Sequence, residues 1–248
     1  MAYTNRTILI TGGNSGIGRA LAEAMLASGN RVIITGRNPS TLQETLESNP
    51  EMAGYTLDVT DQSAVAAFCA TVIADHPELD TVILNAGIME AEDYTAKPVL
   101  LDVADRTIAT NLSAPIQFAA HLLPHLQTRP NAALITVSSG LAFVPKAANP
   151  VYSATKAAIH SWTQSLRHQL RTTSVSVHEI APPLVATDLT PGQSSNAAAM
   201  PSAEFTAEIM DLLNGPEIPD EILVSRVHFQ RRAEAEGRFD AAFTAING

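Results

Sequence analysis

Tyr152 and Lys156 are the residues of this chain whose types and spacing could transfer a proton. They lie four residues apart, so on a helix their side chains would share one face. A lysine ammonium beside a phenol favours the phenolate and would lower the tyrosine pKa from about 10 toward neutrality. A Tyr and a Lys at this spacing also occur in ordinary surface helices, so the pair alone does not identify a catalytic site.

A glycine-rich turn could bind the phosphates of a dinucleotide. It follows the first predicted strand and opens the first predicted helix, where a nucleotide site belongs in a βα alternation. Glycines let the backbone approach a pyrophosphate closely, and the helix N-terminus offers free N–H groups. The spacing Gly-x-x-x-Gly-x-Gly differs from the common Gly-x-Gly-x-x-Gly, and an ordinary strand-to-helix turn is the alternative. The candidate cofactor-binding residues here are Gly12, Asn14, Ser15, Gly16, Ile17 and Gly18.

The end of the second predicted strand bears on the choice of cofactor. NAD-specific domains usually place an acidic side chain here, which holds the adenosine ribose hydroxyls. This chain instead has Gly36 followed by Arg37. A carboxylate that would repel a 2′-phosphate is absent, and a guanidinium able to bind one is present. The sequence therefore favours NADP(H), with NAD(H) as the alternative, because Arg37 could also be a solvated charge at a strand end.

The elements that must position these residues alternate between short β-branched runs and longer segments of helical period. Such alternation is typical of βαβ units on a parallel sheet, and the strands read as continuous apolar runs, as expected when both faces are covered. The predicted strands are 7–11, 31–35, 54–58, 80–84, 132–138 and 174–180. The predicted helices are 15–28, 39–48, 61–75, 99–127 and 151–172. The tail from Glu221 predicts a last strand and a terminal helix.

Segment 181–220 is the least regular part of the chain because six prolines interrupt it. A long insertion late in such a domain is more often a functional lid than a domain boundary, so we predict a substrate lid around 188–215. No low-complexity linker or internal repeat divides the chain, and we expect one domain over 1–248.

Composition excludes several classes of partner and site. The net charge of −10 carries no basic block, which argues against nucleic acid or an anionic membrane as the main partner. There is no signal peptide and no apolar stretch long enough to cross a bilayer, so we expect a cytoplasmic protein. Cys69 is the only cysteine and is expected to be buried. His121 and His125 lack the glutamate and the third ligand of a zinc site, so we predict no metal. Ser139 does not lie in a Gly-x-Ser-x-Gly elbow, which argues against a hydrolase.

With these motifs in order, the chain resembles the short-chain dehydrogenase/reductase family over most of its length. After the glycine turn come an aspartate motif after the third strand, an Asn-Ala-Gly motif after the fourth, an asparagine in a long helix, and a serine thirteen residues before Tyr152. The resemblance implies a Rossmann-type, doubly wound parallel sheet with helices on both faces. It also implies a catalytic tetrad of Asn111, Ser139, Tyr152 and Lys156.

The resemblance also assigns roles beyond the tetrad. Spacing to Tyr152 selects Ser139 over Ser138, which would cap or support the turn, and Asn111 would bend its helix and hold a relay water. Tyr152 and Lys156 would contact the cofactor as well. The remaining cofactor-binding residues implied are Asp58 and Val59 near the adenine, Asn85, Ala86 and Gly87 at its ribose, and Val185 and Thr187 at the carboxamide. The family's helices at 99–127 and 151–172 imply a homodimer or homotetramer, with Trp162 in its interface.

Two features of the chain depart from the common pattern of the family. Pro182-Pro183 replaces the family's frequent Pro-Gly after the sixth strand, and its second proline restricts the backbone on the nicotinamide side. The family's Gly-Gly after the last strand is also missing. These features, together with Gly36-Arg37-Asn38, are similar to a subgroup of oxidoreductases found near genes for teichoic-acid D-alanylation.

The function implied is an NAD(P)(H)-dependent oxidoreductase that interconverts an alcohol and a carbonyl compound. Tyr152 would act as the acid or base while Ser139 holds the substrate oxygen. A nucleotide-binding regulator or scaffold with the same fold is the alternative, although such a protein would typically have lost part of the tetrad. Epimerisation or dehydration with the same cofactor is a third reading without specific support. Pocket walls that would suit an apolar, uncharged substrate, or that core packing would explain equally, are Leu141, Phe143, Val144, Met200 and Phe205.

Overall fold

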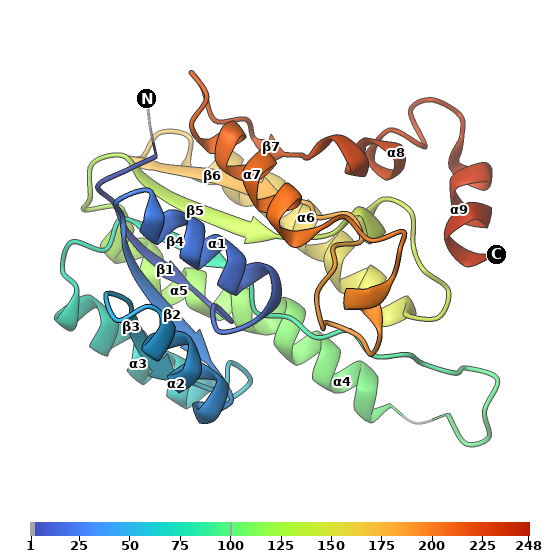
Figure 1. Cartoon of the computed structure of the whole chain (residues 1–248), viewed down its shortest axis with the longest axis horizontal. Helices are drawn as coiled ribbons and strands as arrows, with labels where there is room; N and C mark the ends of the chain where they lie inside the picture. The colour runs from blue at the N-terminus through green and yellow to red at the C-terminus, as the bar shows by residue number, and fades with distance from the viewer. Residues whose placement is uncertain (1–2, 100) are drawn as a thin grey trace.

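Seven parallel strands form the centre of the computed structural model, which describes residues 3–99 and 101–248 (Figure 1). Their order across the sheet is β3-β2-β1-β4-β5-β6-β7. The strands are β1 (Thr7–Ile10), β2 (Arg31–Gly36), β3 (Ala53–Thr56), β4 (Thr81–Leu84), β5 (Ala132–Val137), β6 (Val175–Ile180) and β7 (Glu221–Ile222). The six strands predicted from apolar runs are confirmed, each within two residues at either end. The sheet is the doubly wound parallel sheet that the sequence predicts.

Helices cover both faces of this sheet, and Figure 1 shows α1 and α7 together on one of them. The helices are α1 (Gly16–Ala27), α2 (Pro39–Ser48), α3 (Gln62–Asp75), α4 (Asp102–Ile108), α5 (Ala114–Leu126), α6 (Pro150–Leu170), α7 (Ser202–Leu213), α8 (His228–Arg231) and α9 (Phe239–Asn247). None of the helices described is long and apolar enough to cross a membrane.

Two buried clusters, one on each face, hold the layers together. Successive side chains of a strand point to opposite faces, so in β1 Leu9 enters one cluster while Ile8 and Ile10 enter the other. The first cluster packs the sheet against α3, α5 and α6, and Phe118 of α5 is among its fully buried members. The second packs the sheet against α1, α2 and α7. Cys69 is buried in the first cluster, as predicted.

The long helix predicted over 99–127 is interrupted. Residue 100 lies outside the described part of the chain; beyond it, α4 passes into a π-helical turn at Ala109–Ser113 before α5 begins. The carboxamide of Asn111, in the middle of this turn, accepts from the N–H of Ile88 and donates to its C=O, both at 2.9 Å. A tertiary contact therefore accompanies the local departure from α-helix, a pattern that is frequent at functional sites.

The predicted lid region consists of turns followed by α7. Val185 forms a bridge with Met200, and both are buried in the second cluster together with Phe205 of α7. Val144 is equally buried, against Ala233 and α9. The hypothesis that Val144, Met200 and Phe205 line a substrate pocket is therefore wrong, because their side chains are fully buried in the core.

The tail contains the predicted last strand, β7, and a terminal helix, α9. The charged run at 231–236 forms mostly turn between α8 and α9. Arg231 at the end of α8 donates two hydrogen bonds to the Glu221 carboxylate, at 2.6 and 2.9 Å, and so ties the tail to β7.

Candidate active site

A cleft of about 610 Å³ lies at the carboxyl ends of β1, β2, β4, β5 and β6. The strand order reverses between β1 and β4, and open parallel sheets bind ligands at such a switch point. Every residue that the sequence assigned to cofactor binding lines this cleft, and so do Ser139, Tyr152 and Lys156. Asn111 lies one residue beyond Thr110, which is part of the wall.

The turn between β1 and α1 has the shape that a pyrophosphate needs. Gly12 and Gly16 have φ angles of 66° and 53°, a left-handed conformation that glycine adopts without strain. A Cβ at Gly18 would overlap the carbonyl oxygen of Gly12. The Ser15 side chain does not cap α1, and no acidic residue lies in its first turn. The helix N-terminus therefore offers uncapped N–H groups and the positive end of its dipole to an anion.

The end of β2 leaves no room for an acidic side chain. A Cβ at Gly36 would lie 2.5 Å from Cγ of Asn14. Asn14 is held there because its Nδ2 donates to Oγ1 of Thr41 at 2.6 Å. Arg37 comes next and lines the cleft. The position that carries the acid of NAD-specific domains is thus occupied by a neighbouring side chain, and a cation stands beside it.

Asp58 remains ionised at the same end of the cleft. The backbone N–H and hydroxyl of Thr60 donate to its carboxylate at 2.9 and 2.7 Å and hold its pKa below the usual value. The Arg37 guanidinium lowers that pKa further by a smaller amount. Hydrogen bonds to a carboxylate favour its charged form. Asp58 therefore presents a fixed negative charge to whatever occupies this end.

Ser139, Tyr152 and Lys156 converge at the other end. Ser139 follows β5, and its Oγ accepts from the N–H of Leu141 at 3.1 Å. Tyr152 and Lys156 lie one turn apart on α6, with Lys156 Nζ 5.6 Å from the centre of the Tyr152 ring. Nζ donates to the Val137 carbonyl of β5 at 2.8 Å. The serine hydroxyl, phenol and ammonium thus come from two elements that this contact ties together.

Burial shifts the two titratable groups in opposite directions. It raises the pKa of Tyr152 to about 12, which hydrogen bonding with Ser139 partly offsets. It lowers the pKa of Lys156 to about 8, against which the Glu179 carboxylate acts. The lowered Tyr152 pKa predicted from its spacing to Lys156 is therefore wrong for the protein without a bound cofactor, because desolvation of a buried phenol is the larger effect.

Asn111 contacts both the loop after β4 and helix α6. Both ends of its carboxamide are bonded to Ile88, and its Oδ1 lies 3.3 Å from the place of a Cβ at Gly87. Its Nδ2 also lies 3.4 Å from Oγ1 of Thr155 on α6. Asn111 therefore connects the loop after β4 to the helix that carries Tyr152 and Lys156. The water relay expected from the resemblance stays a prediction.

Two side chains do something other than what the sequence suggested. Ser139 itself, not Ser138, caps the turn after β5, while the buried Ser138 Oγ has no hydrogen-bond partner in the described residues. Asn85 lines the cleft, but its Nδ2 donates to the carbonyls of Thr11 and Gly12 at 3.0 and 3.3 Å. Its Nδ2 therefore fixes the glycine turn, and its contact with a ribose stays a prediction.

The structure adds cleft residues that sequence reasoning missed. Glu90 and Met89 extend the wall beyond Gly87, and Asp188 and Leu189 extend it beyond Thr187. Gln193 fixes this second stretch, because its Nε2 donates to the Val185 carbonyl and to Thr187 Oγ1 at 2.8 and 3.2 Å. Continuity along each loop was the only available signal for these residues.

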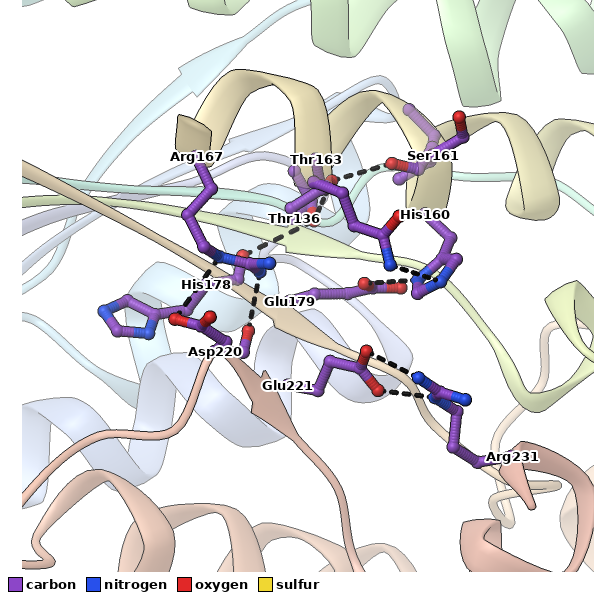
Figure 2. A network of polar contacts seen from close by, with 12 residues as sticks. Thr136, His160, Ser161, Thr163, Arg167, His178, Glu179, Asp220, Glu221 and Arg231 are labelled. Atoms are coloured by element: carbon purple, nitrogen blue, oxygen red, sulfur yellow. Dashed lines mark hydrogen bonds and ion pairs between the residues drawn. The ribbon is translucent and has the colours of Figure 1, made fainter. Parts of the chain in front are cut away.

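A fully buried acid, Glu179, was also missed. It lies on β6 and bonds His160 of α6 at 2.7 Å (Figure 2). A glutamate between the apolar residues Val177 and Ile180 of the predicted strand 174–180 was a signal for it. No three-residue cluster of His, Cys, Asp or Glu suited to a metal occurs among residues 3–99 and 101–248.

Comparison with known proteins gives a consistent result. The family described as short chain dehydrogenase matches residues 6–198. The uncharacterized oxidoreductase DltE of Bacillus subtilis is 40% identical over 251 residues, covering 100% of this chain and 98% of that protein. An uncharacterized oxidoreductase of Staphylococcus epidermidis is 32% identical over 188 residues, covering 75% of this chain and 81% of that protein.

Solved structures share the fold at low sequence identity. A short chain dehydrogenase of Burkholderia cenocepacia in complex with NADP superposes with a TM-score of 0.82 at 21% identity, covering 99% of each chain. A short-chain dehydrogenase of Streptomyces avermitilis superposes with a TM-score of 0.80 at 22% identity, covering 98% of this chain and 96% of that one.

Proposed function

We propose that this protein, which belongs to the short chain dehydrogenase family of oxidoreductases, interconverts an alcohol and a carbonyl compound with NADP(H). One observation carries the proposal. Ser139, Tyr152 and Lys156 meet at one end of a single cleft, and the glycine turn with the uncapped N-terminus of α1 lies farther along the same cleft. An anion-binding turn and a proton-transfer group in one cleft suit a dinucleotide-dependent hydride transfer.

The residues of this chain would handle the proton while the bound nicotinamide supplies or accepts the hydride. In reduction, the hydroxyls of Ser139 and Tyr152 hold the carbonyl oxygen of the substrate, and Tyr152 donates its proton as negative charge develops there. Protonated Lys156 then stabilises the phenolate that remains. In oxidation, the same phenolate accepts the proton of the alcohol.

NADP(H) is favoured over NAD(H) by the end of β2. Asn14 fills the space beside Gly36 that an acidic side chain would need, so the structure supports the absence of a carboxylate there on steric grounds. Arg37 is placed in the cleft wall as a candidate partner for a 2′-phosphate. The similar Burkholderia enzyme was solved with NADP, which agrees with this assignment.

The proposed substrate is uncharged and partly apolar. Arg37 and Lys156 are the basic residues among those that line the cleft. The wall contributed by the loops after β4 and β6 carries acids, such as Glu90, beside apolar Met89 and Leu189. The lining residues of these two loops include no basic side chain, so they would not favour a substrate carboxylate or phosphate. We propose that the substrate lid spans 188–215, which comprises the turns after Thr187 and α7.

The decisive experiment is steady oxidation of NADPH with a panel of uncharged aldehydes and ketones. Tyr152→Phe should abolish turnover while leaving NADPH affinity largely intact, because only the phenolic proton is lost. Tight NADPH binding without turnover on any carbonyl would favour the alternative, a nucleotide-binding regulator. Near-normal activity of Tyr152→Phe would exclude the assigned mechanism.

We further propose assembly as a homodimer or homotetramer through α4, α5 and α6. Ile108 and Ile116 are 41% and 39% exposed on the continuous stretch from α4 to α5. Trp162 of α6 is packed partly against the core, and its place in the interface stays a prediction. The cytoplasmic location stays a prediction from the sequence.

A further inference from the structure

Glu179 is a carboxylate placed where carboxylates are rarely found. It lies on β6, the strand next to the edge strand β7, its exposed fraction is 0%, and its Oε1 has no hydrogen-bond partner in the described residues. Its other oxygen bonds Nδ1 of His160 at 2.7 Å. A buried charge with one free oxygen costs stability unless opposite charges surround it. The neighbourhood therefore has to explain why an acid is present.

That neighbourhood is positive on the side of the catalytic helix. Side chains at alternate positions of β6 face α6, and Val175, Val177 and Glu179 follow that alternation. Lys156 precedes His160 by one turn on α6, so both point toward this part of the sheet. Lys156 is only 4% exposed, and its Nζ bonds the carbonyl of Val137 on β5, the strand next to β6.

We propose that Glu179 is the buried counter-charge of Lys156 and that it acts through this lysine on proton transfer at Tyr152. Glu179 is a positioning residue in this role, since it lies beneath α6 and outside the cleft wall. Its role rests on the proposed function, because it matters to catalysis only if Lys156 does.

The other charged groups around the pair do not replace Glu179. On α6, Tyr152 and His160 flank Lys156, and His160 is the group bonded to the acid. On α8, Arg231 feels the Glu179 charge but is itself bonded to Glu221 of β7. Figure 2 shows these as two neighbouring pairs, His160 with Glu179 and Arg231 with Glu221. Glu179 is the carboxylate that raises the pKa of Lys156 against the effect of burial.

The consequence for Lys156 has a definite sign. Burial disfavours the charged ammonium and lowers its pKa, whereas a nearby carboxylate favours the ammonium and raises it. Removing the carboxylate leaves burial unopposed, so the lysine would lose its proton at a lower pH. A neutral lysine cannot stabilise the Tyr152 phenolate, and reduction would then decline at a lower pH as well.

The test is a direct titration of Lys156, which needs no substrate. The chain has three lysines, Lys97, Lys146 and Lys156, so selective ¹³Cε labelling gives a simple NMR spectrum. The Lys156 signal is assigned by its loss in Lys156→Met. We expect the pKa of Lys156 to fall by about one pH unit in Glu179→Gln, the scale on which a close opposite charge acts.

Glu221→Gln is the matched control. It removes a carboxylate from the adjacent strand β7, and that carboxylate is bonded to Arg231. The titration of Lys156 should be unchanged in this variant. His160→Asn breaks the hydrogen bond to Glu179 but keeps the carboxylate, so it separates the charge of Glu179 from its role in anchoring α6. Lys156 should stay near its wild-type pKa in this variant too.

Melting curves establish whether each variant is folded. If Glu179→Gln does not fold, Glu179→Asp withdraws the charge by one methylene and should lower the Lys156 pKa by a smaller, measurable amount. An unchanged Lys156 titration in a folded Glu179 variant would overturn the proposal, and so would an equal shift in Glu221→Gln. Absence of carbonyl turnover by the wild-type protein would refute the proposed function, but the titration of Lys156 would remain interpretable.

Discussion

Burial governs the chemistry of the two residues that the sequence singled out first. Tyr152 and Lys156 are both removed from water, and burial always disfavours the charged form. Burial therefore raises the pKa of Tyr152 to about 12, so its phenol stays protonated at neutral pH. It lowers the pKa of Lys156 to about 8, so its ammonium is easier to deprotonate. The protein without cofactor is consequently poised as a proton donor, which suits reduction better than oxidation at neutral pH.

This arrangement predicts a pH dependence of opposite sign for the two directions. Below pH 8, Lys156 is charged and Tyr152 is protonated, so kcat/KM for carbonyl reduction should be flat there. Above pH 8 the lysine loses its charge and the reductive kcat/KM should fall. Alcohol oxidation needs the phenolate and should rise with pH over the same range. Initial rates from pH 6 to 10 check both, and reduction that increases above pH 8 would contradict the assignment.

Cofactor preference is a second property argued from single residues. Arg37→Gln should weaken NADPH binding by about tenfold, since a charge-assisted bond to a phosphate is lost. NADH binding should change little because NADH lacks the 2′-phosphate. Fluorescence titration of both nucleotides measures the two affinities. Arg238→Gln, an identical change in the exposed tail, serves as the control. Equal loss of both nucleotides in Arg37→Gln would argue that Arg37 has another role.

Residue types and spacing could predict which side chains share the cleft, because parallel strands deliver their loops to one edge. The cleft wall contains the glycine turn, Asp58, Asn85, Ser139 and the α6 pair. What spacing could not predict is how each group is bonded. The Nδ2 of Asn85 donates to the glycine turn, and burial reverses the expected pKa shift of Tyr152. Both depend on contacts and desolvation that only the folded chain supplies.

At the scale of elements, the π-helical turn between α4 and α5 depends on Asn111. Replacing Asn111 by alanine removes two hydrogen bonds and leaves the N–H and C=O of Ile88 without these partners. The Asn111 side chain is buried and the two bonds are partly buried, so the free energy of unfolding should fall by about 1–3 kcal/mol. Urea denaturation monitored by circular dichroism gives this value.

Asn49→Ala is the matched control for this prediction. Asn49 also uses its carboxamide, donating to the Thr45 carbonyl at 2.9 Å, but it lies at the end of α2 where water can replace the bond. Its loss should cost less than about 1 kcal/mol. Equal destabilisation by the two variants would show that Asn111 is an ordinary helix residue. The turn itself was not predictable, because 99–127 is helical by local preference and its partner Ile88 lies in a distant loop.

Strands were more predictable than the connections between them. Each buried strand is a continuous apolar run with both faces covered, a pattern that survives without tertiary information. Segment 184–201 has no such period, and contacts decide its course: Val185 pairs with Met200, and both enter the core. The apolar residues there were therefore ambiguous between pocket and core until the packing was known.

At the scale of the whole molecule, the family match and the functional cleft coincide. The matched part, 6–198, supplies every strand and loop of the cleft wall. The remainder adds α7 on the second face, β7 at the sheet edge and the tail that packs on Val144. The last fifty residues therefore lie outside the cleft wall and complete the core.

Assembly is the property of the whole molecule that one substitution can test. Ile116 of α5 is 39% exposed on the helical surface where the resemblance predicts the subunit interface. Ile116→Arg should convert the oligomer to monomers, because an unpaired cation would be buried between subunits. Gln43→Arg adds the same side chain to the exposed surface of α2 and should leave the oligomer intact. Sedimentation velocity measures the mass of each variant. A wild-type protein that sediments as a monomer would contradict the predicted assembly, and an Ile116→Arg oligomer would place its interface on another surface.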